Sequence, residues 1–418
     1  MSYPRVLMIN EQSIEKNNAT GITLRSLWNS WPKENIMEIY MDPREIKRKY
    51  LHIEGMTPAF NPLRKLALLK IFSRTNQHLK NKTIPQDFKT SKIFLKTWIR
   101  QLLVVIADSF SVSLNSNQNR KLEEFRPQVI YTLGASVSTL KLAYKISLKY
   151  EIPIVFHYMD NWVEHIQWEK NPMIKWYKNT LQKWHYRCME KVKTAIAISP
   201  IMKNEYEKKF KKKCYVLMNT VELEYFKCKN FKSNKSNRHF IYAGGLHLDR
   251  SKALKDIAEV LKEMKNDDVL DIYTKNNSSE YKKYFKGLPV IFHEEISHKD
   301  IKQIYEIADV LVHAEVQNDI LLGYFKYSIS TKIPEYLATN KPVLFYGPKE
   351  MGLYSYLREN DVAFLASDKK ELFNTIMELD KNNLIENRRR NAQILVDRNH
   401  TSDMSKNILK KVIEMNIE

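Results

Sequence analysis

The stretch QVIYTLGASVSTLKLAYKISLKYEIPIVFHYMD, residues 128–160, decides the fold class of this chain. Short apolar runs stand at both ends, at 128–134 and 152–160, and an amphipathic segment at 136–150 lies between them. Neither run alternates strictly between apolar and polar residues, which is typical of parallel strands covered by helices on both faces. A strand, a helix and a second strand in this order predict one unit of a doubly wound α/β fold.

The same alternation of apolar runs and longer amphipathic segments continues on both sides of this unit. In the first half of the chain, strands are expected at 5–10, 128–134, 152–160, 194–200 and 212–221. In the second half, strands are expected at 239–246, 269–275, 288–296, 309–316 and 341–347. Residues from about 370 to 418 are expected to be helical.

A polar and basic stretch at 222–238 interrupts this pattern and is interpreted as a linker. We therefore predict an α/β protein with two doubly wound, Rossmann-like domains, at 1–221 and 239–395, that face a cleft. The last segment, 396–418, is expected to form a C-terminal helix, and its packing back on the first domain is left open.

Charge and composition limit the classes of partner. The chain has 418 residues, 43% of them hydrophobic, a formal net charge of +20 and a pI of about 9.5. Such a surface attracts polyanions, which include nucleic acid, anionic lipid and phosphorylated substrates. No RNP or zinc-finger pattern is present, so nucleic-acid binding ranks last and no nucleic-acid partner is expected.

Three cysteines without close spacing indicate a reducing compartment and no disulfide framework. The first residues do not resemble a signal peptide, and the apolar run at 102–110 is too short to span a bilayer. We predict a cytoplasmic protein, with peripheral attachment to the inner face of a membrane as an option. The basic segment 44–100 motivates that option, since it can rest on an anionic bilayer or form a solvated helical face of the first domain.

Several residues follow expected strand ends, where an anion is readily bound. Gly21 lies in a loop before a helix, so its backbone N–H is a candidate contact, although taken alone an ordinary turn glycine is the favoured interpretation. Gly244 and Gly245 end the strand at 239–246, and Arg250 and Lys252 follow just before a helix. Positive charge at a helix start is unfavourable because it opposes the helix dipole. The presence of two cations there is therefore better explained if they bind a diphosphate.

A second anion-binding segment is STKIPEYLATNKPVLFYGP, residues 330–348. Ser330 or Thr331 is a candidate N-cap, and Lys332 adds a positive charge at the same helix start. Glu335 lies one turn into the helix, where it can accept hydrogen bonds from a ribose diol, or only favour the helix dipole.

In the first half, His157 and Asp160 are expected just past a strand end, facing the cleft. Either side chain there could orient or deprotonate an acceptor hydroxyl, and a structural histidine in the core is the open alternative for His157. No metal-binding motif, P-loop or nucleophile elbow is recognised, so no metal and no cofactor are expected.

These segments together resemble GT-B glycosyltransferases, in particular glycosyltransferase family 4 and related enzymes of bacterial polysaccharide synthesis. The resemblance covers most of the chain and is best in 239–348. The segment GGLHLDRS matches the family's G-R-L-x-x-x-K-G pattern in spacing, with Arg250 at the Lys position and Gly245 at the Arg position. Glu335 matches the second glutamate of the family's pair, and Tyr327 stands at the position of the first.

The resemblance implies transfer of a sugar from a nucleotide-sugar donor to a glycan, a lipid-linked molecule or another hydroxyl acceptor, with retention, in bacterial surface polysaccharide synthesis. It implies a UDP-sugar in preference to a GDP-sugar. The implied catalytic residues are His157, Asp160 and Arg250. The implied donor-binding residues are Gly21, Gly244, Gly245, Arg250, Lys252, Ser330, Thr331, Lys332 and Glu335.

Two alternatives remain open from the residues. Because Tyr327 and Gly245 depart from the family pattern, the chain could be a catalytically weak nucleotide- or sugar-binding partner of a glycan assembly complex. A sugar-nucleotide epimerase of the same architecture is the other.

Overall fold

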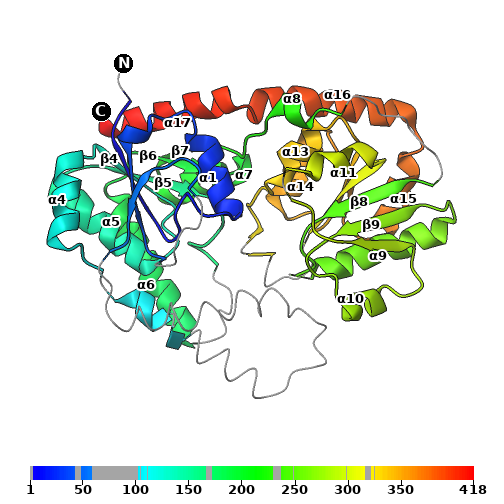
Figure 1. Cartoon of the computed structure of the whole chain (residues 1–418), viewed down its shortest axis with the longest axis horizontal. Helices are drawn as coiled ribbons and strands as arrows, with labels where there is room; N and C mark the ends of the chain where they lie inside the picture. Colours follow the sequence, from blue (N-terminus) through cyan, green and yellow to red (C-terminus); the bar gives the residue numbers. More distant parts are fainter. Residues whose placement is uncertain are drawn as a thin grey trace. The chain divides into compact units, whose positions relative to one another are not determined.

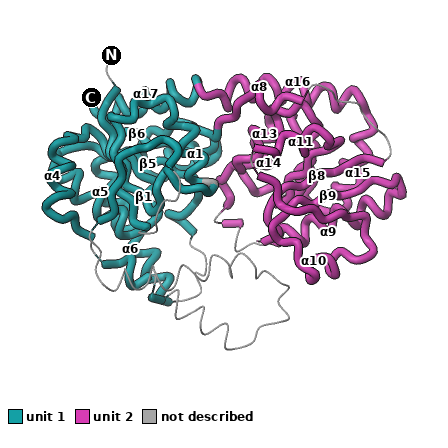
Figure 2. Tube along the Cα trace, viewed as in Figure 1, with its two compact units in different colours: residues 1–80, 84–219, 403–418 teal, residues 81–83, 220–402 magenta. Residues whose placement is uncertain are grey.

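The predicted α/β fold of two Rossmann-like sheets is confirmed by the computed structural model of the chain (Figure 1). The structure describes residues 3–42, 49–58, 102–103, 105–110, 112–165, 172–228, 237–247, 249–297, 299–315, 322–323 and 325–418. The chain divides into two compact units, coloured separately in Figure 2. Among the described residues, unit 1 runs to residue 219 and includes 403–418, and unit 2 holds 220–402.

Unit 1 is built on a sheet of strands in the order β3-β2-β1-β4-β5-β6-β7, all parallel to their neighbours. In chain order, the strands are β1 Val6–Asn10, β2 Ile36–Tyr40, β3 Glu54–Met56, β4 Val129–Thr132, β5 Ile154–Tyr158, β6 Thr194–Ala197 and β7 Lys213–Val216. The helices are α1 Ala19–Trp28, α4 Ser116–Phe125, α5 Val137–Tyr150, α6 Pro172–Met189, α7 Pro200–Phe210 and α17 Ser402–Ile417, with a 3-10 turn at Lys33–Asn35.

Unit 2 is built on a second parallel sheet, in the order β10-β9-β8-β11-β12-β13. Its strands are β8 His239–Ala243, β9 Val269–Tyr273, β10 Val290–His293, β11 Val310–Ala314, β12 Val343–Tyr346 and β13 Phe364–Ala366. Its helices are α8 Leu223–Phe226, α9 Arg250–Met264, α10 Ser279–Tyr284, α11 Ile301–Ile307, α13 Lys332–Ala338, α14 Gly352–Glu359, α15 Lys369–Glu378 and α16 Asn382–Asn399.

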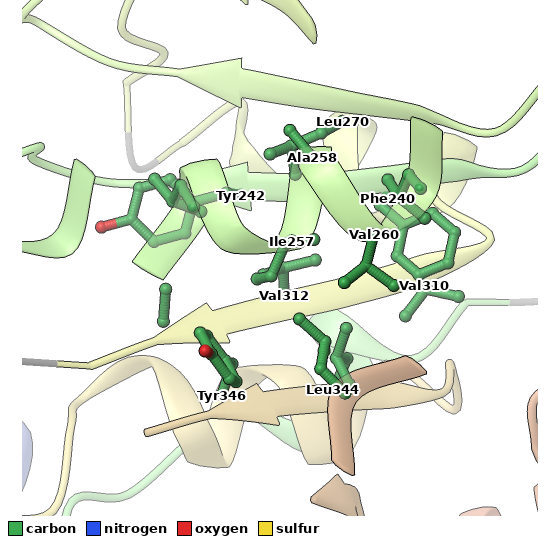
Figure 3. Close-up of a cluster of buried hydrophobic side chains, with 14 of the residues drawn as sticks. Phe240, Tyr242, Ile257, Ala258, Val260, Leu270, Val310, Val312, Leu344 and Tyr346 are labelled. Atoms are coloured by element: carbon green, nitrogen blue, oxygen red, sulfur yellow. The ribbon is translucent and has the colours of Figure 1, made fainter. Parts of the chain in front are cut away.

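The core of unit 2 forms where α9 lies on the sheet (Figure 3). Apolar residues of α9 recur at helical spacing, so one face of the helix is buried against β8, β9 and β11. Apart from the first residues of β8 and β9, these strands in turn are buried, and this explains why their sequences are mostly apolar.

The chain reverses its direction of sheet growth once in each unit. In unit 2, β9 and β10 extend the sheet from β8 to one side, and β12 and β13 extend it from β11 to the other. The point of reversal therefore lies between β8 and β11, and in unit 1 it lies between β1 and β4. In open α/β sheets, ligands bind beyond the carboxyl ends of the strands at this point.

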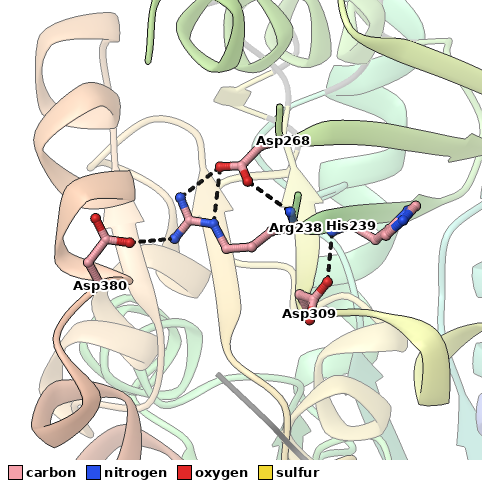
Figure 4. Close-up of polar contacts among 5 residues, drawn as sticks. All are labelled: Arg238, His239, Asp268, Asp309 and Asp380. Carbon is pink, nitrogen blue, oxygen red and sulfur yellow. Dashed lines mark hydrogen bonds and ion pairs between the residues drawn. The ribbon is translucent and has the colours of Figure 1, made fainter. Parts of the chain in front are cut away.

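A buried ion-pair network fixes the start of β8 (Figure 4). Arg238, only 2% exposed, donates from Nε and Nη2 to Asp268 at 3.0 and 2.7 Å, and from Nη1 to Asp380 at 3.0 Å. The next residue, His239, donates its backbone N–H to Asp309 Oδ2 at 2.9 Å. A buried guanidinium needs such partners because an unpaired charge is costly in the interior.

The C-terminal helix packs on unit 1 (Figure 1). Leu409, Val412 and Ile413 of α17 are buried in the same core as residues of β1 and β4. Asn416 adds polar contacts to β6, since its Oδ1 accepts from the N–H of Thr194 and its Nδ2 donates to Thr194 Oγ1 at 2.6 Å. The structure thus places the end of the chain in the first unit.

Several sequence predictions differ from the structure in detail. Strands β2, β3 and β13 were not predicted, because β2 carries the buried carboxyl group of Glu38 and the other two strands are only three residues long. Residues 223–226, expected in the linker, form α8, which packs on α13 in unit 2. Residues 396–399, expected in the last helix, belong to α16. Among the described residues, no helix is long and apolar enough to cross a membrane.

Candidate functional site

The candidate site lies in unit 2 at the carboxyl ends of β8 and β11, on either side of the point where the sheet reverses its growth. Gly244 and Gly245 follow β8 directly, and Glu315 follows β11 directly. Arg250 and Lys332 reach the same place from the starts of α9 and α13. Three segments of the chain, at 244–250, at Glu315 and at Lys332, therefore meet where a doubly wound sheet binds its ligand.

Arg250 is the first residue of α9, and its side chain is 24% exposed. Its Nη2 lies 3.3 Å from Oε2 of Glu315, across the gap between the two strand ends. Burial opposes the positive charge, but Glu315 and Tyr242 outweigh it and raise the pKa of Arg250. The guanidinium is thus held at a helix start, where the dipole disfavours it, by a carboxylate from another strand.

Glu315 is 5% exposed and is held on two sides. Its Oε1 lies 2.8 Å from Nε2 of His313, and its backbone N–H donates to the carbonyl of Tyr346 at 3.0 Å. Burial favours the neutral acid, yet Arg250 and His313 together lower the pKa of Glu315 to about 2. The carboxylate is therefore ionised at neutral pH, and it balances the charge of Arg250.

Lys332 begins α13 and donates a hydrogen bond from Nζ to the carbonyl of Ala243, the last residue of β8. A Cβ on Gly244 would lie 2.5 Å from this Nζ, so a larger residue there would force the ammonium group to move. Burial and then the charge of Arg250 lower the pKa of Lys332 to about 8, against the opposite effects of Glu335 and Glu315. The two cations therefore share one small region.

Glu335 lies in the first turn of α13, where a carboxylate favours the helix dipole. Tyr305 of α11 donates its hydroxyl to Glu335 Oε2 at 3.1 Å. The side chain of Glu335 is partly exposed, and a carboxylate can accept hydrogen bonds from the hydroxyls of a ligand. Its charge also acts on Lys332, one turn earlier.

The other residues predicted for donor binding are less closely tied to this cluster. Thr331 is the N-cap of α13 but makes no capping bond with its side chain, whereas Ser330 Oγ accepts from the N–H of Lys332 at 3.4 Å. Gly245 accepts a hydrogen bond from the hydroxyl of Tyr242 at 2.8 Å. Lys252 is exposed, and its charge acts on Asp256.

The prediction for Gly21 is wrong in its geometry. Gly21 lies inside the first turn of α1, and its N–H donates to Oδ1 of the N-cap Asn18 at 2.8 Å. This N–H is therefore already paired and is not a free donor for an anion. A glycine is needed because a Cβ would collide with the carbonyl oxygen of Lys16.

The position predicted for His157 is also wrong. His157 lies within β5 and is fully buried, and its Nδ1 lies 2.6 Å from the hydroxyl of Tyr131. Burial lowers the pKa of His157 to about 3, so the ring is neutral. The structure favours the core histidine that the sequence left as the alternative. Asp160 follows β5 and is partly exposed, and its catalytic role stays a prediction.

Sequence reasoning missed Glu315, His313 and Tyr305. Glu315 was included in the strand predicted at 309–316, so its carboxylate was not considered as a site residue. The available signal was a charged residue directly after an apolar run, at the end of a central strand.

The structure also locates two departures from the family pattern. Tyr327, at the position of the family's first glutamate, is buried, with 8% of its surface exposed. Asn340, which stands where the family has glycine, has a φ of 63° just after α13 and is one of the residues that accept this left-handed conformation. Within the described residues, no group of three or more His, Cys, Asp or Glu side chains is placed to hold a metal ion.

Solved structures share this architecture over the whole chain. HepE from Anabaena, solved in complex with UDP and glucose, is 13% identical with a TM-score of 0.61, over 99% of this chain and 100% of that chain. A glycosyltransferase from Rickettsia africae is 12% identical with a TM-score of 0.63, over 100% and 99%. A sucrose-phosphate synthase from Thermosynechococcus elongatus is 12% identical with a TM-score of 0.61, over 99% and 98%.

No protein-family model and no curated protein sequence matches this chain. At the identities above, the likeness to solved structures concerns the fold. The chain has the GT-B fold of glycosyltransferases, as the sequence resemblance predicts.

Proposed function

We propose that this protein is a glycosyltransferase that uses a nucleotide-sugar donor. The observation that carries the proposal is the convergence of Lys332 and Arg250 beside Gly244, at the sheet reversal of unit 2. Two cations and a glycine backbone at such a place are suited to a diphosphate. The shared fold adds support, since HepE was solved with UDP and with UDP-glucose.

In this proposal Lys332 and Arg250 contact the diphosphate of the donor. As the bond between the sugar and the diphosphate breaks, negative charge grows on the departing phosphate, and fixed cations stabilise that charge. Glu335 accepts hydrogen bonds from the ribose hydroxyls, while Tyr305 holds the carboxylate in place. Asp160 is proposed to orient the acceptor hydroxyl from unit 1.

The finer parts of the proposal come from the family resemblance. They are a UDP-sugar in preference to a GDP-sugar, a glycan or lipid-linked acceptor, retention at the anomeric carbon, and a role in bacterial surface polysaccharide synthesis. Peripheral membrane attachment through 44–100 belongs with them, and most of that segment lies outside the described residues. Salt-sensitive sedimentation with anionic liposomes tests the attachment; no binding would remove it from the proposal.

The test of the proposal is a binding screen followed by a turnover assay. UDP, GDP, ADP and CMP are titrated into the purified protein by calorimetry, with thermal unfolding as a second readout. One nucleoside diphosphate should bind, and its UDP- or GDP-sugar should be hydrolysed or transferred. Lys332→Ala, Arg250→Ala and Glu335→Ala should each weaken binding by about tenfold or more.

Lys262→Ala provides a matched control, because Lys262 is an exposed lysine of α9 outside the cluster. Its affinity should equal that of the parent. If the three cluster variants also bind as tightly as the parent, the site is misplaced.

The second candidate is a nucleotide- or sugar-binding partner without turnover. The buried Tyr327, at the position of a family carboxylate, favours it. Binding of a nucleoside diphosphate without any hydrolysis or transfer across a panel of donors would decide for this candidate.

A further inference from the structure

We propose that Glu315 is an internal counter-ion of Arg250. The carboxylate of Glu315 pairs with the guanidinium when the site is empty, and it competes with the donor diphosphate for this guanidinium. The inference rests on the proposed function and assigns a role to a residue that no family motif marks. Glu315 is thereby a positioning residue, because it acts through Arg250.

Two hydrogen bonds hold Glu315 in place. His313 holds Oε1 at 2.8 Å, and the backbone N–H of Glu315 is tied to β12 through Tyr346. His313 is itself buried and stacked on Phe345, with ring centroids 5.9 Å apart. The carboxylate is therefore anchored on the sheet, and Oε2 is presented to Arg250 at 3.3 Å.

Arg250 is held less completely than Glu315. Its Nη2 meets the carboxylate, the hydroxyl of Tyr242 also contacts the guanidinium, and its Nε is buried without a hydrogen bond to the residues that the structure describes. A guanidinium forms its strongest contacts as a two-pronged donor to carboxylate or phosphate oxygens. The side chain is 24% exposed and one of its donors is unpaired, so a phosphate can engage the guanidinium as the contact to Glu315 loosens.

The charges of the cluster make such an exchange reasonable. Arg250 and Lys332 are both cationic, and Glu315 reduces their mutual repulsion in the empty site. An incoming diphosphate supplies the same compensation but also meets the negative charge of Glu315. The carboxylate therefore stabilises the empty protein and weakens diphosphate binding, which favours release of the nucleoside diphosphate product.

The test is Glu315→Gln, which keeps the size and one hydrogen-bonding oxygen but removes the charge. UDP and inorganic pyrophosphate should each bind about tenfold tighter than to the parent, because one unit charge near the phosphates is gone. Uridine, which lacks phosphate, should bind equally to both proteins. Glu263→Gln, on the exposed face of α9, is the control for net charge and should match the parent.

A purely structural role predicts a different result. If Glu315 only orients Arg250, the variant binds UDP more weakly than the parent. If Glu315 only supports the fold, the affinities for UDP and for uridine change by the same factor. A counter-ion predicts a lower melting temperature of the empty variant and a larger UDP-induced shift, since the phosphate replaces the lost charge. Stopped-flow release of UDP should slow by about tenfold.

A second variant covers the case in which Glu315→Gln does not fold. Glu315→Asp keeps the charge but withdraws it from Arg250, and it should bind UDP tighter than the parent by about two- to threefold. Unchanged or weaker UDP binding in the folded variants overturns the inference alone. Absence of nucleoside diphosphate binding by the parent overturns the proposed function and the inference together.

Discussion

Lys332 provides the sharpest test of the proposed site, because its charge should change within an accessible pH range. Burial and Arg250 lower its pKa from 10.5 to about 8 in the empty protein. The neighbouring groups do not titrate in that range: the pKa of Glu315 is about 2, and that of Tyr242 is raised to about 12. The second ionisation of a phosphate lies near pH 6 and is complete above about pH 7.

The expected magnitude follows from the protonated fraction of Lys332. If only the ammonium form binds the diphosphate, the apparent Kd is the intrinsic Kd divided by that fraction. With a pKa of about 8, nearly all of the protein is competent at pH 7 and about one-tenth is competent at pH 9. UDP binding should therefore weaken by about tenfold from pH 7 to pH 9, and binding in this range should take up protons.

The assay is calorimetry in pairs of buffers with different ionisation enthalpies, which reports both the affinity and the proton uptake. Lys332→Arg should remove the pH dependence, since a guanidinium stays charged throughout. Lys262→Arg, at an exposed site of α9, should retain the dependence of the parent. A parent affinity that is flat between pH 7 and 9, or a Lys332→Arg protein that still weakens, would refute the reasoning.

Three further predictions concern stability. Burial raises the pKa of Glu38 to about 7, so the folded protein holds a proton that the unfolded chain releases above about pH 4.5. The parent therefore loses stability as the pH rises from 5 to 8, and the free energy of unfolding of Glu38→Gln should increase relative to that of the parent by up to about 3 kcal/mol. Urea unfolding at both pH values measures this, and an unchanged difference contradicts it. Asp268→Ala should lower the free energy of unfolding by about 3–5 kcal/mol, because Arg238 is left buried without its main partner (Figure 4). The double variant with Arg238→Met should recover part of this loss of stability, and equal losses in the two variants would argue against an ion-pair origin. Asn416→Ala should lose about 2–3 kcal/mol in urea unfolding, because the buried polar groups of Thr194 lose their partner; a loss below about 0.5 kcal/mol would show that apolar packing alone holds α17.

The strands of the two sheets were predictable where they are long and buried on both faces. Mostly apolar runs such as 154–158 and 310–314 carry a strong local signal, because parallel strands covered on both faces are built mainly from apolar residues. The short strands β3 and β13 carry almost no such signal. Their pairing is decided by neighbouring strands that are distant in the sequence.

The candidate site was predictable only in part. Gly244, Arg250, Lys332 and Glu335 stand beside predicted strand ends and helix starts, so their residue types and positions indicated an anion site. His157 was placed wrongly because a strand end cannot be located to within a residue or two from a single sequence.

By itself, the sequence determined the α/β class, the two-domain organisation and the segments that hold the cations, since these follow from local patterns of apolar and charged residues. Only the tertiary structure decided which charges face each other. Glu315 and Arg250 are separated by 65 residues in the chain, and the parallel pairing of β8 with β11 brings them together. Parallel pairing depends on the sum of many long-range contacts, and no local pattern encodes it.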